Sequence, residues 1–171
     1  MVRLALWIDQ LNEKVGRAVS WLTLFLMLIT TLDVLFRYAF SLTAAWVTEL
    51  EWHLFALIFL LGAGYTLKHD QHVRVDVFYS RFNPRTKAWV NIFGVLFLLV
   101  PLCIFVLRSS FRVAYISFQR GEGSSEDYGL PALYLIKFAI TLCFFFLFLQ
   151  GISLLIHSIQ QLRSRPNSSP T

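Results

Sequence analysis

The stretch AWVNIFGVLFLLVPLCIFVL, residues 88–107, decides the fold, because it runs for 20 residues without a charged side chain. A helix of about 20 apolar residues has the length needed to cross the ~30 Å hydrocarbon core of a bilayer. The sequence therefore predicts a membrane-spanning helix here. Pro101 within it removes one backbone hydrogen bond, so we expect the helix to bend near that residue.

Three other apolar stretches of comparable length occur along the chain. They cover about residues 18–36, 44–67 and 132–157. The few charged side chains that they contain lie toward one end of each stretch, where a long side chain can reach the membrane surface at low cost. We therefore predict an all-α integral membrane protein with four transmembrane helices.

The composition supports this class and excludes several others. Hydrophobic residues make up 57% of the chain and charged residues only 15%, where an average soluble domain is about 25% charged. Such a sequence has too little polar surface for a soluble globular protein and too much apolar mass for a disordered one. Cys103 and Cys143 lie inside apolar stretches, so neither a disulfide scaffold nor a cysteine metal site is supported.

The basic residues predict which side of the membrane each loop occupies. Ten of the 15 Lys and Arg residues lie on the side that holds both chain ends, and four lie on the opposite side. Basic residues are retained on the cytoplasmic side of membrane proteins. Both termini are therefore expected in the cytoplasm. The basic loop over residues 68–87 lies on that side too, where it favours anionic lipid headgroups.

Residues 1–17 have the pattern of an amphipathic helix that lies in the headgroup plane. Its apolar face holds Leu4, Trp7, Ile8, Leu11 and Val15, and its polar face holds Arg3, Asp9, Glu13 and Lys14. The chain therefore divides into this interfacial helix over residues 1–17, a membrane domain over residues 18–158, and a polar cytoplasmic tail over residues 159–171.

Two groups of polar residues occur inside the predicted spans. Asp33 and Arg37 are four residues apart, with the acid first, and are expected to form an ion pair near the outer end of the first span. Glu49 and His53 share one helix face of the second span, which continues at Ala56 and Ala63. Small residues let another helix approach closely, so this stripe is a packing surface, either within the chain or against a second protein. An ion or proton path is the alternative.

The four histidines raise the question of a haem or metal site. His53 and His157 differ in depth by about 25 Å along their predicted spans, so they cannot be axial ligands of one haem. His69 and His72 are three residues apart in the loop after the second span, with Asp76 nearby. No further residues complete a ligand set there, so we expect neither a metal nor a cofactor.

Several motifs occur in an order that resembles a known family. Trp46 precedes Glu49-Leu50-Glu51-Trp52-His53 at the start of the second span. His72, Arg74 and Asp76 alternate just after that span, and Gly129-Leu130-Pro131 opens the fourth. In this order around four spans, the sequence resembles the small membrane subunit, DctQ, of tripartite ATP-independent periplasmic (TRAP) transporters. The family motif residues here are Trp46, Glu49, Glu51, His72, Arg74, Asp76, Gly129 and Pro131.

The resemblance implies an accessory transport subunit rather than an enzyme. In such systems a periplasmic binding protein captures an organic acid or related solute, and a large multi-span subunit moves it with sodium by an elevator motion. The small subunit would brace that partner in a 1:1 complex in the bacterial inner membrane, among membrane lipids and without nucleic acid. The absence of a charged residue from the middle of any predicted span agrees with this role, since a transporter's own ion site lies near the midplane.

Two interaction surfaces follow as hypotheses. The stripe of Glu49, His53, Ala56 and Ala63 would contact the large subunit or the adjacent span. The outer loops would dock the binding protein; the alternative is that they are solvated connectors without a recognition role. The docking residues would be Arg37, Arg120, Glu122, Glu126 and Asp127.

Two alternatives from other classes stay open at this stage. The chain could be a self-sufficient proton-coupled transporter that works as a homodimer, with Glu49 or Glu51 as the proton carrier. Both carboxylates lie shallow in the span, which argues against this role. A redox membrane anchor is the other alternative, and the different depths of the histidines disfavour it.

Overall fold

A computed structural model of the chain describes residues 2–41, 44–69, 82–125 and 128–163. All of the regular structure in these residues is helical, and no strand occurs among them. The elements are α1 (Val2–Phe40), α2 (Ala45–Lys68), α4 (Pro84–Phe93), the π-helix η1 (Gly94–Leu99), α5 (Val100–Gln119) and α6 (Leu133–Arg163).

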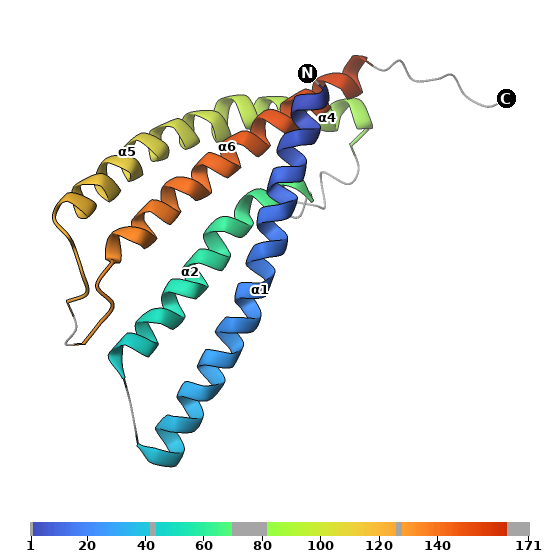
Figure 1. Ribbon diagram of the computed structural model, residues 1–171. Helices are drawn as coiled ribbons and strands as arrows, with labels where there is room; N and C mark the ends of the chain where they lie inside the picture. Colours follow the sequence, from blue (N-terminus) through green and yellow to red (C-terminus); the bar gives the residue numbers. More distant parts are fainter. Residues whose placement is uncertain (1, 42–43, 70–81, 126–127, 164–171) are drawn as a thin grey trace.

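The four predicted spans are confirmed as helices. Four helical stretches are long and apolar enough to cross a membrane, and each covers one of the predicted spans to within one residue. They are Val2–Phe40, Ala45–Lys68, Pro84–Gln119 and Leu133–Arg163. The start of α1 and the end of α6 lie at one end of the molecule, here named the terminal end (Figure 1). The opposite end, here named the loop end, holds the α1–α2 and α5–α6 connections.

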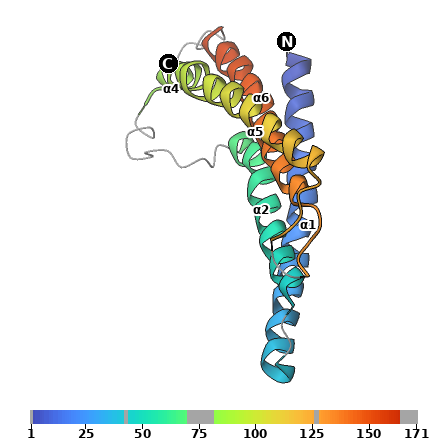
Figure 2. The same cartoon turned by 90° about the vertical axis from the view of Figure 1, so that its left-hand side faces the viewer.

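The helices form a layer rather than a closed four-helix bundle. In Figure 1 they lie side by side in the order α5, α6, α2, α1, and the view turned by 90° in Figure 2 shows a narrow slab. Helix α6 is central, because it packs against α1, α2, α4 and α5. A layer of this kind leaves apolar side chains exposed on its faces, which is favourable where the solvent is lipid.

The core within the layer is correspondingly small. Leu67 of α2, Cys103 of α5 and Leu147 of α6 form a buried cluster, and Ala63 and Leu99 pack against it. Outside this cluster, many large side chains face outward; Phe59 of α2, for example, is 74% exposed. The layer therefore gains little of its stability from a soluble-type core.

Glycines set the closest helix contacts. Gly64 of α2 lies against the side chain of Asn12 on α1, and Gly16 of α1 lies against the ring of Tyr65. A Cβ atom added at either glycine would clash with these neighbours. Small residues allow such close approach between membrane helices, where dispersion contacts replace the hydrophobic effect as the driving force.

The helix expected over residues 1–17 is not a separate element. Helix α1 runs unbroken from Val2 to Phe40, about 58 Å at 1.5 Å per residue, which exceeds the thickness of the hydrocarbon core. Its first turns cross α6, so that Ala5, Ile8 and Asn12 are buried. The buried face of this segment therefore combines apolar and polar residues.

The third span departs from a simple proline bend. A π-helical stretch, η1, ends at Leu99, two residues before Pro101, and the N–H of Val100 bonds back five residues to the carbonyl of Val95. Pro101 has no N–H to donate, so the hydrogen-bond ladder has to change near it. The sequence identifies the position of the irregularity, and the structure gives its form.

Candidate functional site

At the loop end, Glu49 fastens α2 to the loop between α5 and α6. Its carboxylate accepts a hydrogen bond from the hydroxyl of Ser124 and another, at 2.6 Å, from the backbone N–H of Leu130. Glu49 is only 8% exposed. A carboxylate with two donors in a partly desolvated place is well satisfied. The Glu49 side chain thus positions two parts of one loop.

A second carboxylate, that of Glu122, organises the same loop from within. It accepts hydrogen bonds from the Ser117 hydroxyl and the Lys137 ammonium, both at 2.5 Å. These two contacts, first that of Lys137 and then that of Ser117, hold the pKa of Glu122 below its usual value. The backbone N–H of Glu122 also bonds to the Ser117 carbonyl at 3.1 Å, after a turn at Gly121 with φ of +61°. Glycine adopts that conformation without strain, so the loop leaves α5 in a defined direction.

Asp33 and Arg37 lie on α1 near the loop end. The Arg37 guanidinium donates to the Asp33 carboxylate at 2.5 Å. The Asp33 side chain is 7% exposed, whereas that of Arg37 is 45% exposed. The arginine therefore neutralises a buried acid while part of it stays accessible at the loop end.

The stripe expected on α2 is used for contacts within the chain. Besides Glu49, His53 donates from Nδ1 to the Glu49 carbonyl at 2.6 Å, and Ala63 packs against the core cluster. Ala56 between them is half-buried. Within the chain, Glu49 and Ala63 of this stripe contact other elements, the α5–α6 loop and the core cluster.

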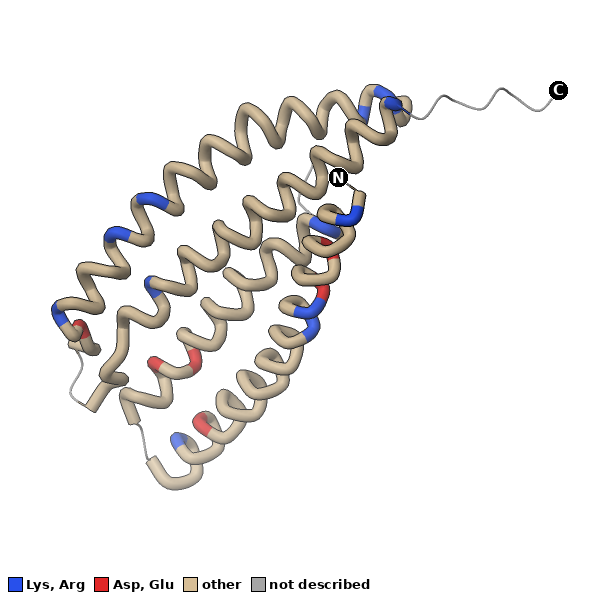
Figure 3. Tube along the Cα trace, turned by 45° about the horizontal axis from the view of Figure 1, so that its top comes forward, with Lys and Arg blue, Asp and Glu red and all other residues tan. Residues whose placement is uncertain are grey.

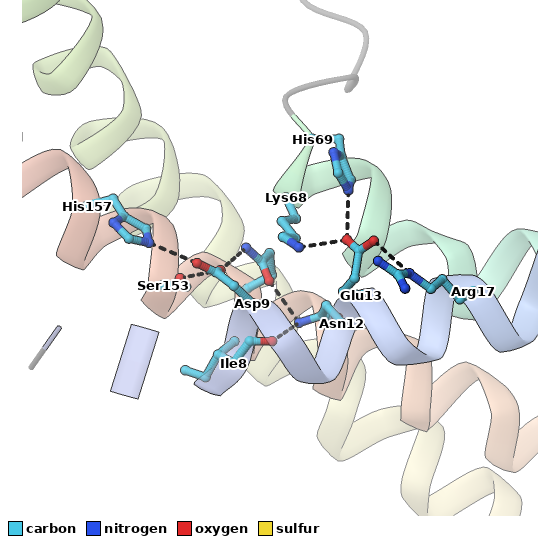
Figure 4. A network of polar contacts seen from close by, with 10 residues as sticks. Ile8, Asp9, Asn12, Glu13, Arg17, Lys68, His69, Ser153 and His157 are labelled. Carbon is cyan, nitrogen blue, oxygen red and sulfur yellow. Dashed lines mark hydrogen bonds and ion pairs between the residues drawn. The ribbon is translucent and has the colours of Figure 1, made fainter. Parts of the chain in front are cut away.

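At the terminal end, Asp9 of α1 is the centre of a polar network with α6 (Figure 4). Its carboxylate accepts hydrogen bonds from Ser153 at 2.6 Å, from Gln150 at 2.9 Å and from His157 at 2.9 Å. Asn12 joins the network by donating to the side-chain oxygen of Gln150 at 2.8 Å. This network fixes the first turns of α1 to α6.

Glu13 makes the corresponding connection from α1 to α2 (Figure 4). It accepts from the ammonium of Lys68 at 2.7 Å and from the imidazole of His69 at 3.0 Å. Arg17, one turn along α1, donates to the other carboxylate oxygen at 3.1 Å. Asp9 and Glu13 together tie α1 to two helices at the terminal end.

Sequence reasoning missed this terminal-end network. It placed Asp9 and Glu13 on a solvent-facing polar side, because no local pattern shows that their partners lie on α2 and α6. The signal that could have found it is the pair Gln150 and Ser153, two polar residues three apart in an otherwise apolar stretch. Polar side chains inside a span need partners from a neighbouring helix.

Other predicted residues take more isolated positions. Trp46 lines an apolar pocket between α1 and α2 together with Asp33. One carboxylate oxygen of Glu51 is buried and has no hydrogen-bond partner among the described residues. Arg120 caps the end of α5, and Gly129 lies against the Ser124 side chain. Pro131 is exposed, in the loop that leads into α6.

The remaining predicted residues lie outside the described residues. They are His72, Arg74, Asp76, Glu126 and Asp127. Among the residues that are described, no group of three His, Cys, Asp or Glu side chains could hold a metal ion. His69 and His157 are engaged instead by Glu13 and Asp9.

Comparison with known proteins identifies the family. The model of the DctQ component of tripartite ATP-independent periplasmic transporters matches residues 26–161, which include all of α2 and α5 and most of α6. No curated protein and no solved structure matches the chain. The matched region covers most of the chain and includes at least part of each of the four helices that can cross a membrane. The chain therefore belongs to the DctQ family and is the small membrane subunit of a TRAP transporter.

Proposed function

We propose that this subunit braces the large membrane subunit of a sodium-coupled TRAP transporter that imports an organic acid or a related small solute. The observation that carries the proposal is the distribution of charge. Among the described residues, Lys, Arg, Asp and Glu gather toward the two ends of the layer, and an uncharged band crosses the middle (Figure 3). An ion or substrate path needs polar groups at that depth. Transport itself then belongs to the partner.

The polar networks support a bracing role. Asp9 and Glu13 hold α1 to α6 and α2 at the terminal end, and Glu49 holds α2 to the α5–α6 loop at the loop end. The layer is thus fastened at both ends while its apolar faces are exposed. A thin, rigid layer can lie along a larger membrane protein in a 1:1 complex. It would hold the static part of that larger protein in place while the larger protein's mobile part moves.

The interface with the large subunit is assigned to the exposed apolar faces of the layer. The stripe of Glu49, His53, Ala56 and Ala63 supports it indirectly, because Glu49 and Ala63 hold α2 to the chain's own loop and core cluster.

The loop end is assigned to the docking of the periplasmic binding protein. Glu122 and Glu49 stiffen the α5–α6 loop, and Arg37 and Arg120 are both accessible at this end. With Glu126 and Asp127, the loop carries a mixed charge pattern of the kind that steers protein association. The excess of Lys and Arg at the terminal end supports a location of both termini in the cytoplasm and of this loop in the periplasm of a bacterial inner membrane.

Reconstituted uptake tests this function. Vesicles with the large subunit, binding protein and substrate should take up substrate only when this chain is present and a sodium gradient is applied. Reversal of Glu122, Glu126 and Asp127 to Lys should weaken binding-protein affinity at least tenfold and leave the membrane complex intact. Reversal of Arg3 and Lys14 to Glu, at the terminal end, is the matched control. Uptake without this chain, or equal affinity in both variants, would contradict the proposal.

A further inference from the structure

Two arginines lie on the outer edge of the layer. Arg108 and Arg112 are one turn apart on α5, the helix at one edge of the row of four in Figure 1, and both are exposed. The buried residues of α5 lie on the other side of the helix, which packs against α6. We name the exposed side the α5 edge and define it by Ile104, Phe105, Arg108, Arg112 and Tyr115.

Neither arginine has a partner within the described part of the chain. Lys137 on the neighbouring helix is paired with Glu122. Arg108 and Arg112, in contrast, form no hydrogen bond or ion pair with any described residue. Phe105, one turn before Arg108, is apolar and 73% exposed. The α5 edge therefore presents two guanidinium groups in a mostly apolar surrounding.

Arg108 lies within the depth of the hydrocarbon core. A hydrogen bond of 3.1 Å from Thr141 to Ser110 fixes the register of α5 against α6. Arg108 is therefore level with about residue 143 of α6, about 15 Å from the start of that helix at Leu133. Helix α6 has 31 residues and is about 46 Å long, so about 8 Å of each end lies outside a ~30 Å core when the helix is upright and centred. Arg108 is then about 7 Å inside the core, at the border of the uncharged band.

The direction of α5 turns Arg108 away from the nearer membrane surface. The Cα–Cβ bonds of a helix tilt toward its N-terminus. Helix α5 runs toward the loop end, so its side chains lean toward the middle of the layer. Lipid phosphates lie outside the core, and acyl chains accept no hydrogen bonds. The acceptor that fits a guanidinium at this depth is a carboxylate of a neighbouring membrane protein.

The opposite edge of the layer has no such requirement. Helix α1 has no charged residue between Arg17 and Asp33. Its exposed side chains in this stretch include Trp21 and Leu28. Lipid chains can cover such a surface without leaving a polar group unsatisfied. The two edges of the layer therefore differ in what they need from their surroundings.

We propose that the large membrane subunit docks on the α5 edge, through a transmembrane helix whose Asp or Glu side chains accept hydrogen bonds from Arg108 and Arg112. Arginine binds carboxylates in a bidentate way, which fixes geometry as well as adding energy. Phe105 and Tyr115 beside the arginines add aromatic contact area of the kind that is enriched in protein interfaces. The inference rests on the proposed function, whose interface it narrows from the exposed faces of the layer to one edge.

Photo-crosslinking in the native membrane tests which edge is covered. Phe105 on the α5 edge and Trp21 on α1, which is 66% exposed, are matched aromatic sites for a photo-reactive residue. The Phe105 site should label the large subunit, with an Asp or Glu within one helical turn of the labelled position. The Trp21 site should label lipid. Lipid labelling at Phe105, or equal labelling of the large subunit from both sites, would overturn the proposal.

Removal of the two charges tests the chemistry of the contact. Arg108→Gln with Arg112→Gln should lower recovery of the large subunit in a detergent pull-down at least tenfold. Thermal unfolding of the chain in detergent should not change, because neither side chain has a partner among the described residues. Arg3→Gln with Lys14→Gln, which removes the same charge at the terminal end, should leave recovery as in the wild type.

The outcomes separate this inference from the proposed function. Full recovery of the large subunit with the arginine variant would refute the α5 edge as its docking site, while the complex and the bracing role would stand. A wild-type chain that recovers no large subunit would overturn the proposed function, and this inference with it.

Discussion

The carboxylate of Glu49 accepts a hydrogen bond at 2.6 Å from the backbone N–H of Leu130, a residue 81 positions further along the chain. This single contact joins α2 to the start of the segment that leads into α6. The loop that is assigned to the binding protein therefore depends on a residue in a neighbouring helix.

Glu49→Ala should loosen the α5–α6 loop. Without the carboxylate, the Leu130 N–H and the Ser124 hydroxyl lose their acceptor. Hydrogen exchange of the Leu130 and Ser124 amides should become at least tenfold faster, with little change in the helices. Glu51→Ala is the control, because no described residue donates to the buried oxygen of Glu51. Equal exchange in both variants would contradict the assigned role of Glu49.

Asp9→Ala should release the first turns of α1 from α6. The change leaves Gln150, Ser153 and His157 without their shared acceptor, and a buried donor without a partner costs about 1–3 kcal/mol. Thermal unfolding in detergent should show this loss, and proteolysis should cut the first turns of α1 faster. Arg3→Ala, on the exposed side of the same helix, should behave as the wild type.

Gly64→Ala and Gly62→Ala should differ, although the two glycines are two residues apart on α2. A Cβ at Gly64 clashes with the Asn12 side chain, whereas a Cβ at Gly62 meets no atom within 4 Å. Overpacking typically costs about 1–3 kcal/mol. Thermal unfolding should therefore show destabilisation for Gly64→Ala alone. If both variants were equally stable, the close α1–α2 contact would be wrong.

The Glu122 contacts should make loop order depend on acidic pH. The pKa of Glu122 is lowered by Lys137 and Ser117, so the folded loop favours the charged carboxylate. The resulting stabilisation is complete above the ordinary glutamate pKa of 4.5 and is lost as the pH falls through the lowered value. A spin label at position 125 should stay immobile down to about pH 4.5 and become mobile below it. Glu122→Gln should be mobile at all pH values; an immobile label in that variant would refute the contact.

The sequence predicts the fold well where a local pattern decides it. An uncharged stretch such as residues 88–107 predicts a span by length alone. The spacing of Asp33 and Arg37 is likewise local, and the two side chains form an ion pair in the structure. Residues of this kind need no knowledge of which helices are neighbours.

The polar networks could not be predicted in the same way. Asp9 and Ser153 are 144 positions apart, and their contact depends on α1 crossing α6. The layer, with its open faces, likewise depends on which of the four apolar helices become neighbours. Apolar residues on every side of a helix leave that choice undetermined. The sequence signals of these contacts are the glycines that allow close approach, such as Gly64, and the polar pair Gln150 and Ser153 within an apolar stretch.

The most direct test of the account is the mass and composition of the intact complex that this chain forms in its native membrane. The chain should be tagged, purified in a mild detergent and weighed by native mass spectrometry. We expect a 1:1 complex with a large multi-span membrane subunit. A homodimer of this chain that transports solute on its own would contradict it, and would make Glu49 and Glu51 the working residues of an autonomous transporter.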